Sequence, residues 1–600
     1  MSIRRHQIPA GASLIEGGGA NFRIWAPGCK TVGLLLESAG TEPVTSPMEA
    51  LPEGWHALTV PDTKAGTLYR FVLPDGMRVP DPASRFQPQD VHGPSEVIDP
   101  AAYDWTVAWS GRVWDEIVLY ELHVGTFTPE GTFLAAIGKL DHLQKLGVTG
   151  IEIMPVWDFP GKRNWGYDGV LPYAPDSVYG RPEDLKALVE AAHQRGIAVL
   201  LDVVYNHFGP DGNYLPVYAP SFFTERHHTP WGAAVNYDGE HSKPVREFVI
   251  HNALYWLEEF DLDGLRFDAV HAIIDDGPRH LLDELSERVR AASSRPVHLL
   301  LENEDNEPKR LTRKGRDPVH FTAQWNDDIH HVLHVAATGE RSGYYADYAD
   351  QNELLAKALS EGFAYQGQMM PYRGSARGEP AAYLPPGAFV AFIQNHDQIG
   401  NRAFGDRLSQ IASPEAMRAL AAVYLLLPQT PMIFMGEEWA AAQPFPFFCD
   451  FEGDLADAVR KGRREEFARF PEFQDPEQRD RIPDPLAEST FTSAKLDWSA
   501  VDQSGPKSHI AHYTALLATR RQHIVPLLAS ITHGGSATQF GPGAVEAIWQ
   551  LGEGRSLKLT ANLSGVHIDF PPATGQPIWS EGDTVPALGP WAVRWSLETP

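Results

Sequence analysis

Eight short apolar runs recur along the central part of this chain, and helix-forming segments separate several of them. Strand runs that alternate with helices predict an α/β protein with a parallel sheet, and eight such strands predict a (β/α)8 TIM barrel. A doubly wound sheet is the alternative, but the glycine-rich phosphate turn that often accompanies that fold is missing. The runs are Ile117–Tyr120, Val148–Val156, Ile197–Leu201, Gly264–Phe267, Val297–Leu301, Phe321–Trp325, Phe389–Ile393 and Pro431–Met435.

Short β-type runs flank the predicted barrel on both sides. Before it lie Asn21–Pro27 and Leu68–Leu73, with glycine and proline turns nearby and no helix signal. Comparable runs return after the barrel at Leu557–Leu563 and Trp591–Trp595. The chain is also too long for one core. We therefore expect an N-terminal β-sandwich over residues 1–108, the barrel with loop insertions over 109–525, and a C-terminal β-sandwich over 526–600.

Charge and composition limit the classes of molecule that this protein could bind. The formal net charge of −28 would repel nucleic acid and an anionic membrane surface, and no apolar run is long enough to span a membrane. The sixteen Trp and nineteen Tyr suit a sugar or another neutral, flat-faced ligand, although most of them belong in the core. Cys29 and Cys449 do not indicate a disulfide, and no apolar segment follows the basic N-terminus. We expect a cytoplasmic protein, monomeric or weakly oligomeric, without a cofactor.

The stretch Gly264–His271 carries the first candidate for chemistry. Side chains alternate along a strand, so Arg266 and Asp268 project to the same side. An arginine beside an aspartate keeps that aspartate ionised at neutral pH. An ionised carboxylate at the C-terminal end of a buried strand suits a covalent nucleophile. A structural ion pair at a strand end explains the two residues equally well.

Polar groups at other strand ends would meet Asp268 at the same rim of a barrel. They are Asp202 with Asn206 and His207, then Glu302, then His396 with Asp397. Carboxylates that converge at one rim are costly unless function requires them. One ionised and one protonated carboxyl group is the arrangement that cleaves a glycosidic bond, and here Glu302 would be the protonated acid. A metal site built from Asp and Glu is the alternative.

Four of these stretches resemble, in order, the four signature regions of the α-amylase superfamily of glycoside hydrolases. They are Asp202–His207, Gly264–Asp268, the strand end at Glu302, and Asn395–Asp397. The resemblance implies a retaining mechanism on α-glucans. It implies Asp268 as the nucleophile, Glu302 as the general acid/base, and Asp397 as a third carboxylate that holds sugar hydroxyls and favours the transition state.

The resemblance also implies which residues surround the sugar in subsite −1. Arg266, His207 and His396 resemble residues that contact the nucleophile or the sugar. Asp202 resembles the residue that supports Arg266 and that subsite. Tyr167 resembles the aromatic platform beneath the sugar.

Longer stretches resemble one family within this superfamily, the maltooligosyltrehalose trehalohydrolases. They are Trp165–Gly180, Tyr205–Leu215, Gly462–Phe467 and Pro483–Trp498. The stretch Phe22–Pro27 is similar to the carbohydrate-binding-like β domain that precedes the barrels of both this family and the branching enzymes. The resemblance implies hydrolysis of the α-1,4 bond next to the terminal trehalose of maltooligosyltrehalose. An α-1,4-glucan branching enzyme, a general α-amylase-type hydrolase and a non-catalytic glucan-binding scaffold are the alternatives. The presence of all three carboxylates argues against the scaffold.

Two positions depart from the pattern of many amylases. Where those carry Lys-His, this chain has His271 followed by Ala272. We expect His271 to face the leaving group, although a histidine bonded to backbone at a helix start fits nearly as well. Glu304 competes with Glu302 for the role of acid, because strand parity puts both on the same side. We prefer Glu302 because it directly ends the apolar run.

The aromatic stretch Pro444–Phe451 follows the eighth run, where loops of a barrel carry binding residues. We expect Phe447, Phe448 and Asp450 to contact the trehalose unit, and the alternative is a hydrophobic plug beneath a loop. Near Asn206, which occupies the position of a calcium ligand in many amylases, no convincing set of partner aspartates is present. We therefore predict no required metal.

Overall fold

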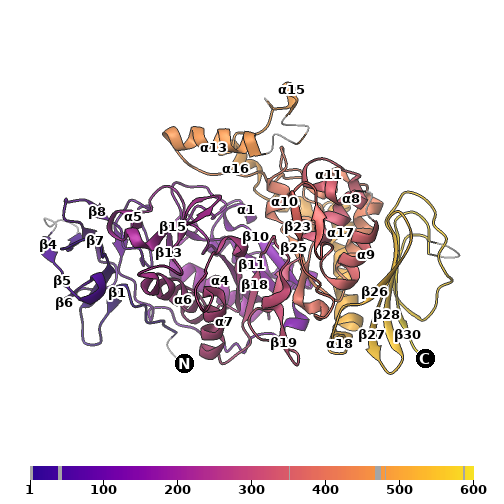
Figure 1. Cartoon of the computed structure of the whole chain (residues 1–600), viewed down its shortest axis with the longest axis horizontal. Helices are drawn as coiled ribbons and strands as arrows, with labels where there is room; N and C mark the ends of the chain where they lie inside the picture. The colour runs from indigo at the N-terminus through magenta and orange to yellow at the C-terminus, as the bar shows by residue number, and fades with distance from the viewer. Residues whose placement is uncertain are drawn as a thin grey trace.

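A computed structural model describes residues 4–37, 44–349, 352–466, 470, 474–479, 481–584 and 588–600. It places three parts in a row, with a β domain at the N-terminal end, a barrel in the middle and a β-sheet at the C-terminal end (Figure 1). Phe467, the last residue of the stretch Gly462–Phe467, lies outside the described residues. Among the helices described, none combines the length and the apolar character that a membrane span requires.

The central part is a closed barrel of eight parallel strands that follow one another in chain order. They are β10 (Leu119–Leu122), β11 (Gly150–Ile153), β14 (Ala198–Val203), β17 (Gly264–Phe267), β18 (His298–Leu301), β21 (Ala323–Trp325), β24 (Phe389–Ala391) and β25 (Thr430–Phe434). The last strand pairs with the first in parallel, with Leu119 opposite Met432. Each strand overlaps one of the eight predicted runs, so the predicted barrel is confirmed.

Helices on the outside and apolar side chains on the inside bury these strands. Helix α4 (Pro182–Gln194) begins at a proline, and α6 (Ser242–Glu259) buries Trp256 and Leu257. A separate cluster of buried side chains from several strands forms the apolar filling of the barrel. Its members include Leu119, Leu200, Leu300, Val390 and Met432. Gly264 lets β17 and β18 pack closely, because a Cβ there would lie 2.1 Å from the carbonyl oxygen of His298.

The N-terminal part is a β-sandwich, as predicted. One sheet contains β1 (Gly11–Leu14), β2 (Ala20–Trp25), β6 (Trp55–Val60) and β5 (Glu49–Ala50). The other contains β4 (Val44–Pro47), β3 (Gly33–Glu37), β7 (Leu68–Val72), β8 (Arg78–Val79) and β9 (Ser95–Glu96). Phe22, Leu34 and Phe71 are fully buried between the sheets. Arg85 joins this part to the barrel, because its guanidinium donates to Glu259 at the end of α6.

The C-terminal part is a β domain, but its described strands form one antiparallel sheet and not the expected sandwich. The sheet order is β26 (Ser536–Gly541), β27 (Ala544–Gly552), β28 (Arg555–Asn562), β30 (Ala592–Glu598) and β29 (Gln576–Glu581). Its apolar face packs against the barrel helices α9 (Asn352–Glu361) and α12 (Pro414–Tyr424). Trp595 Nε1 donates to the carbonyl oxygen of Ala422 at 2.9 Å. The helices therefore take the place of a second sheet.

An arm projects from the barrel after the last strand (Figure 1). It contains α13 (Gly453–Glu466) and α15 (Pro476–Arg479). The chain then returns through α16 (Glu488–Ser493) and α17 (Ser504–Thr519) to the C-terminal sheet.

Candidate active site

Arg266 occupies the centre of the polar end of the barrel. Its Nη1 atom donates to Asp268 Oδ1 at 2.8 Å and to Asp202 Oδ2 at 2.7 Å. Its guanidinium lies 4.1 Å from the ring centre of Trp325, and the residue is only 2% exposed. In the pairing of β14 with β17, Asp202 lies directly opposite Arg266. The structure thus brings together the three strand-end residues that the sequence places at one rim.

Tyr167 ties this group to a neighbouring loop. Its hydroxyl donates to Asp202 Oδ2 at 2.6 Å, and its ring stacks on His396 at a centroid distance of 5.1 Å. Burial raises the pKa of Asp202 to about 7, because the attraction of Arg266 only partly offsets the loss of hydration. The predicted platform residue therefore lies beside both His396 and the Arg266 cluster.

Glu302 follows β18 directly and faces Asp268 across the strand pair. Its Oε2 accepts the backbone N–H of Ala269 at 2.6 Å and lies 3.8 Å from Arg266 Nη2. Burial raises the pKa of Glu302, and the charge of Asp268 adds to this effect, while Arg266 and His271 oppose it. Glu302 therefore keeps its proton more readily than a free glutamate does.

Asn206 and His207 continue the same network. Asn206 Nδ2 donates to Asp268 Oδ2 at 3.2 Å, and Asn206 Oδ1 lies 2.9 Å from His207 Nδ1. The other ring nitrogen of His207 lies 3.0 Å from the carbonyl oxygen of Tyr167. Burial lowers the pKa of His207, although the charge of Asp268 opposes this. Both carboxylate oxygens of Asp268 thus have a donor, one from Arg266 and one from Asn206.

Trp231 is a residue that the sequence interpretation missed. It lies between β15 (Phe223–Thr229) and β16 (Gly232–Val235), is 48% exposed, and stacks on His207 at a centroid distance of 4.9 Å. An exposed tryptophan stacked on a site residue offers a flat face to a sugar. The only sequence feature that marks Trp231 is the glycine after it, in the long segment between two barrel strands. This feature did not distinguish Trp231 from the many tryptophans of the core.

His396 and Asp397 begin helix α10 (His396–Gly400) after an Asn395 cap. His396 Nδ1 lies 2.5 Å from Glu121 Oε1. Burial alone would lower the pKa of His396, but the charges of Glu121 and Asp397 raise it above its ordinary value. Asp397 is exposed, and its Oδ1 accepts Asn401 Nδ2 at 2.8 Å. The third predicted carboxylate is therefore open to a ligand.

Asp327 is a further carboxyl group that the sequence interpretation missed. It begins α8 (Asp327–Thr338) after β21, and β21 lies between β18 and β24 in the barrel. Its position therefore falls between Glu302 and Asp397. Gln398 Nε2 donates to Asp327 Oδ1 at 3.1 Å. Burial raises the pKa of Asp327 to about 8, and the charges of Glu302 and Asp397 contribute to the shift.

Two glutamates inside the barrel also escaped the sequence interpretation. Glu121 of β10 and Glu152 of β11 lie opposite each other in the strand pairing and are each 1% exposed. Burial, and then the charge of Glu121, raise the pKa of Glu152 well above its ordinary value. Glu152 stands within the run Val148–Val156, so the hydrophobic pattern hides it. Glu121 directly follows the run Ile117–Tyr120, a position that the sequence interpretation overlooked.

The structure does not place Glu304 beside Glu302, so the parity argument for Glu304 is wrong. Strand β18 ends at Leu301 and the chain turns immediately after Glu302. The side chain of Glu304 is 57% exposed and its Oε2 lies 3.7 Å from His271 Nε2. His271 Nδ1 also accepts the backbone N–H of Glu304 at 3.4 Å. His271 is thus partly held by backbone, as its alternative interpretation proposed, yet it is close enough to Glu302 to affect its pKa.

The three residues expected after the eighth strand have different environments. Phe448 is fully buried and packs against Phe445 and Phe491, which contradicts the expected substrate contact. The plug interpretation is correct for this residue. Asp450 pairs with Arg163 at 2.6 Å and accepts the backbone N–H of Lys162, so it fastens a loop.

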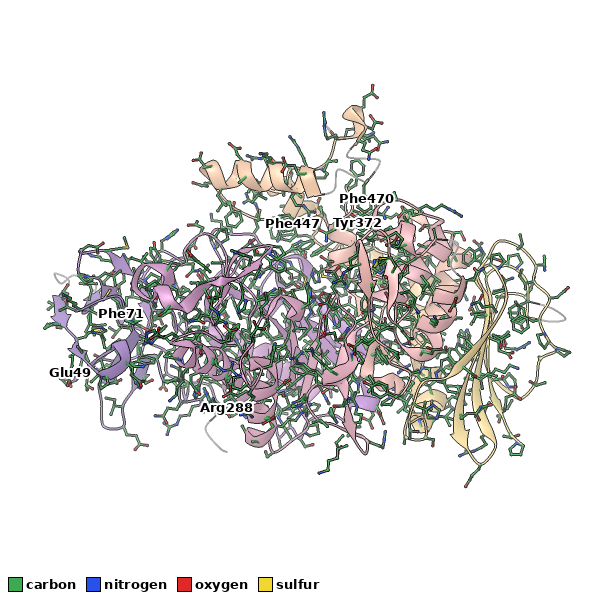
Figure 2. All side chains as sticks on the ribbon, in the orientation of Figure 1. Glu49, Phe71, Arg288, Tyr372, Phe447 and Phe470 are labelled. Atoms are coloured by element: carbon green, nitrogen blue, oxygen red, sulfur yellow. The ribbon has the colours of Figure 1, made fainter. Side chains whose placement is uncertain are left out.

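Phe447 is only half-buried and lies below the arm (Figure 2). Its ring lies 5.1 Å from that of Trp165, which in turn lies 5.2 Å from His396. Phe447 is therefore partly exposed and packs directly against Trp165, the neighbour of His396.

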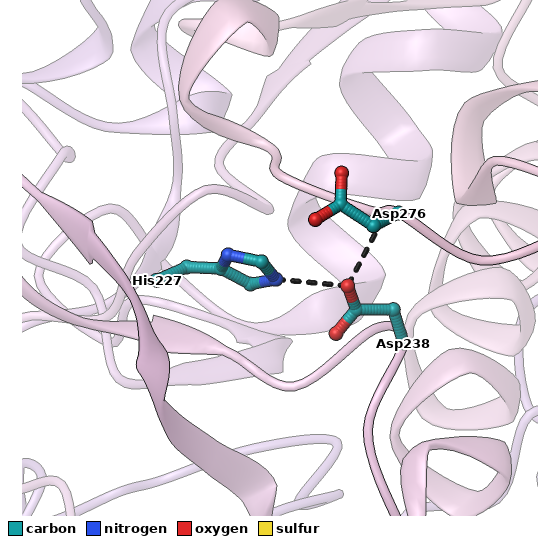
Figure 3. Close-up of side chains that lie close together, drawn as sticks. All are labelled: His227, Asp238 and Asp276. Carbon is teal, nitrogen blue, oxygen red and sulfur yellow. Dashed lines mark hydrogen bonds and ion pairs between the residues drawn. The ribbon is translucent and has the colours of Figure 1, made fainter.

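Within the described residues, one group of side chains could offer three ligand atoms to a metal ion. It consists of His227, Asp238 and Asp276, whose candidate atoms lie within 4.8 Å of one another (Figure 3). His227 Nε2 lies 2.8 Å from Asp238 Oδ2, and Arg226 Nη1 lies 3.2 Å from Asp238 Oδ1. Both oxygens of Asp238 therefore have protein partners. The absence of a required metal stays a prediction.

Three family models match the chain. "Alpha amylase, catalytic domain" matches residues 92–220, "Carbohydrate-binding module 48 (Isoamylase N-terminal domain)" matches 9–84, and "Domain of unknown function (DUF3459)" matches 532–595. A malto-oligosyltrehalose trehalohydrolase from Deinococcus radiodurans is 43% identical over 559 residues, which cover 90% of this chain and 89% of that protein. The chain belongs to the malto-oligosyltrehalose trehalohydrolase family.

A second relative carries the same name, and a solved structure described as an alpha amylase has a similar fold. The malto-oligosyltrehalose trehalohydrolase from Saccharolobus solfataricus is 40% identical over 511 residues, which cover 85% of this chain and 86% of that protein. A crystal structure of a Salmonella typhimurium protein matches with a TM-score of 0.93 at 46% identity and covers 99% of this chain and 100% of that one. The resemblance to this family is confirmed, and the chain is a glycoside hydrolase.

Proposed function

We propose that this protein hydrolyses the α-1,4-glucosidic bond next to the terminal trehalose of maltooligosyltrehalose and releases trehalose and a maltooligosaccharide. One observation carries the proposal. The guanidinium of Arg266 bonds to Asp268 and lies 3.8 Å from Glu302, at the ends of two adjacent strands. This arrangement favours an ionised nucleophile beside a protonated acid, which is the pair that a retaining glycosidase needs.

In the first step, a carboxylate oxygen of Asp268 attacks the anomeric carbon and forms a glycosyl ester with the enzyme. The bond from that carbon to the leaving oxygen breaks, and Glu302 gives its proton to the departing trehalose. The raised pKa of Glu302 supports its role as acid. The two donors on Asp268, Arg266 and Asn206, orient the carboxylate for attack.

In the second step, water attacks the same carbon and Glu302, now ionised, takes a proton from it. The ester bond breaks, so Asp268 returns to its carboxylate form and the maltooligosaccharide is released. The N–H of Ala269 donates to Glu302 Oε2 and supports the ionised state between the two steps. We assign to Asp397 the hydroxyls of the sugar in subsite −1, since its side chain is exposed beside His396.

The residues that recognise the trehalose unit belong to the same proposal. His271 and Phe447 remain the candidates on the leaving-group side, and the exposed face of Trp231 joins them. We leave out Phe448 because its ring is buried, and we assign to Asp450 the holding of a loop through Arg163. We also propose that the enzyme works in the cytoplasm as a monomer or weak oligomer and needs no cofactor.

A branching enzyme is the nearest alternative, because it shares the same carboxylates and passes the glycosyl group to a glucan hydroxyl instead of water. One assay separates the two activities. The purified full-length chain is given maltooligosyltrehalose in one reaction and amylose in another. We expect free trehalose from the first and no new α-1,6 branches in the second. Branches on amylose without trehalose release would overturn the proposal.

A further inference from the structure

Arg463 in the arm reaches the helix that carries Asp397. Its Nη1 donates to Asn401 Oδ1 at 2.7 Å, and its Nη2 donates to the carbonyl oxygen of Gly400 at 3.0 Å. Its guanidinium also lies 4.7 Å from the ring centre of Phe447. One side chain of α13 therefore contacts both the end of α10 and the loop after the last barrel strand. Arg463 belongs to the stretch Gly462–Phe467, which contains none of the proposed catalytic residues.

Asn401 passes this contact to the catalytic end of the barrel. Its Nδ2 donates to Asp397 Oδ1 at 2.8 Å. A side-chain amide has one accepting end and one donating end, whereas a guanidinium can only donate. Arg463 therefore requires the oxygen of Asn401 on its side, which leaves the amide nitrogen for Asp397. Without Arg463 the amide keeps its bond to Asp397 but loses the other of the two hydrogen bonds that the structure describes for the Asn401 side chain.

We propose that Arg463 is a positioning residue for Asp397 and acts through the orientation of the Asn401 amide. The inference rests on the role proposed above for Asp397 in holding the sugar of subsite −1. It gives the arm a function in the reaction, because docking of α13 fixes the donor that holds the third carboxylate. It also gives Phe447 a second role, since its ring supports the guanidinium.

Arg460 provides a matched control on the same helix. It lies one turn before Arg463 in α13, and its bonds go to Asp484 and Asp457, each at 3.0 Å. Neither partner belongs to α10. The Arg460→Gln variant therefore removes the same charge and the same planar fork from the arm without altering the contact to Asn401.

The experiment measures kcat and KM for trehalose release by the full-length enzyme. The variants are Arg463→Gln, Asn401→Ala, the double variant and Arg460→Gln. We expect Arg463→Gln and Asn401→Ala each to lower kcat by roughly tenfold with KM within about twofold, because a small misplacement of a catalytic group is costly. The double variant should lose no more than either single one, since both break the same chain of contacts. Arg460→Gln should stay within about twofold of wild type.

Arg463→Lys tests the donor itself. Lysine keeps a cationic donor but lacks the fork that bonds Asn401 and Gly400 together. We expect it to recover part of the kcat lost in Arg463→Gln, and thermal unfolding of every variant shows whether the fold is intact. The inference would be overturned if the kcat loss of the double variant equalled the product of the two single losses. It would also be overturned if Arg463→Gln and Arg460→Gln had equal kcat values. A wild-type enzyme that releases no trehalose would instead overturn the proposed function.

Discussion

Arg266 determines the electrostatics of the site from a single position. Its guanidinium bonds to Asp202 and Asp268 and lies near Glu302, and it rests on the ring of Trp325. Lysine has one compact cationic centre and cannot serve several carboxylates and an aromatic face at the same time. The planar fork is therefore what makes three neighbouring acids compatible with a folded protein.

The two central carboxyl groups lead to the first prediction. We expect Asp268→Ala and Glu302→Gln each to lower kcat by several orders of magnitude, because the first removes the nucleophile and the second the acid. Glu304→Gln should stay within a few-fold of wild type, since Glu304 lies at the surface. Trehalose release measures the activity, and circular dichroism checks the fold. An active Glu302→Gln variant beside an inactive Glu304→Gln variant would transfer the role of acid to Glu304.

Asp327 leads to a prediction about pH and stability. Its pKa is raised from 3.8 to about 8 in the folded protein. Between these values the folded chain holds a proton that the unfolded chain has released, so the stability from this group falls as the pH rises from about 4 to 8. The Asp327→Asn variant lacks this titration. Relative to wild type it should gain roughly 1–3 kcal/mol in free energy of unfolding between pH 5 and pH 8.

Urea unfolding of both proteins at the two pH values measures this gain. In the variant, the amide oxygen at position 327 can still accept the hydrogen bond from Gln398 Nε2. The two proteins therefore differ at this position mainly in charge. A difference between the proteins that does not change with pH would show that Asp327 ionises normally.

At the level of the elements, the register of β17 and β18 sets the geometry of the reaction. Phe267 lies opposite Leu301, so Asp268 and Glu302 occupy the next paired positions on adjacent strands. Adjacent strands lie about 4.8 Å apart. This spacing favours the carboxyl separation of about 5–5.5 Å of retaining enzymes over the wider separation of inverting ones.

The register therefore predicts retention of configuration. We expect the first new reducing end released by the enzyme to be the α-anomer, observed by proton NMR before mutarotation. A carboxyl separation of about 9 Å in a crystal structure, the inverting distance, would contradict this prediction. So would a β-anomer as the first product.

The barrel was predictable from sequence because each strand is an apolar run, and several runs end in a polar residue. Asp202, Asp268 and Glu302 stand directly at such ends, which made them visible. Asp327 was missed because it follows a strand of only three residues and reads as the first turn of a helix. Hydrophobic periodicity also does not predict side-chain direction in irregular segments. It therefore gave no sign of the turn after Glu302 or of the inward direction of the Phe448 side chain.

Partners that are distant in the chain are equally invisible to a sequence pattern. Arg463 lies in a polar helix, and its partner Asn401 precedes it by 62 residues. A charged residue on such a helix is typical of a solvated surface. Only the docking of the arm on the barrel distinguishes Arg463 from Arg460.

On the scale of the whole molecule, the C-terminal sheet completes the hydrophobic core on one side of the barrel. Trp595 is fully buried, stacks on Trp549 at 5.8 Å and bonds to Ala422 of α12. An ion pair between Arg418 of α12 and Glu581 of β29 lies beside this contact. The barrel and the sheet therefore depend on each other for the burial of α12.

This dependence predicts the effect of Trp595→Ala. We expect it to lower the free energy of unfolding by about 3–5 kcal/mol, the usual loss for a buried tryptophan. The catalytic constants at 25 °C should change by less than about twofold, because the site lies at the end of the barrel. Chemical denaturation and trehalose release measure the two quantities, with Val566→Ala at an exposed position as the control. A large fall in kcat in a Trp595→Ala enzyme that is still folded would contradict the expectation that this contact affects stability and not catalysis.

The carboxyl groups around Arg266 have a consequence for inhibition. Asp202, Asp268, Glu302, Asp327 and Asp397 all lie at this end of the barrel, in a protein with a net charge of −28. Burial raises the pKa of Asp202, Glu302 and Asp327, and Arg266 adds a positive charge, so the carboxylates that lie near the substrate as negative charges are Asp268 and Asp397. These two carboxylates favour the positive charge that develops on the sugar ring in the transition state. A protonated imino sugar of glucose should bind more tightly than glucose itself and lose that advantage once its amine is deprotonated. Sugar phosphates of similar size should be excluded.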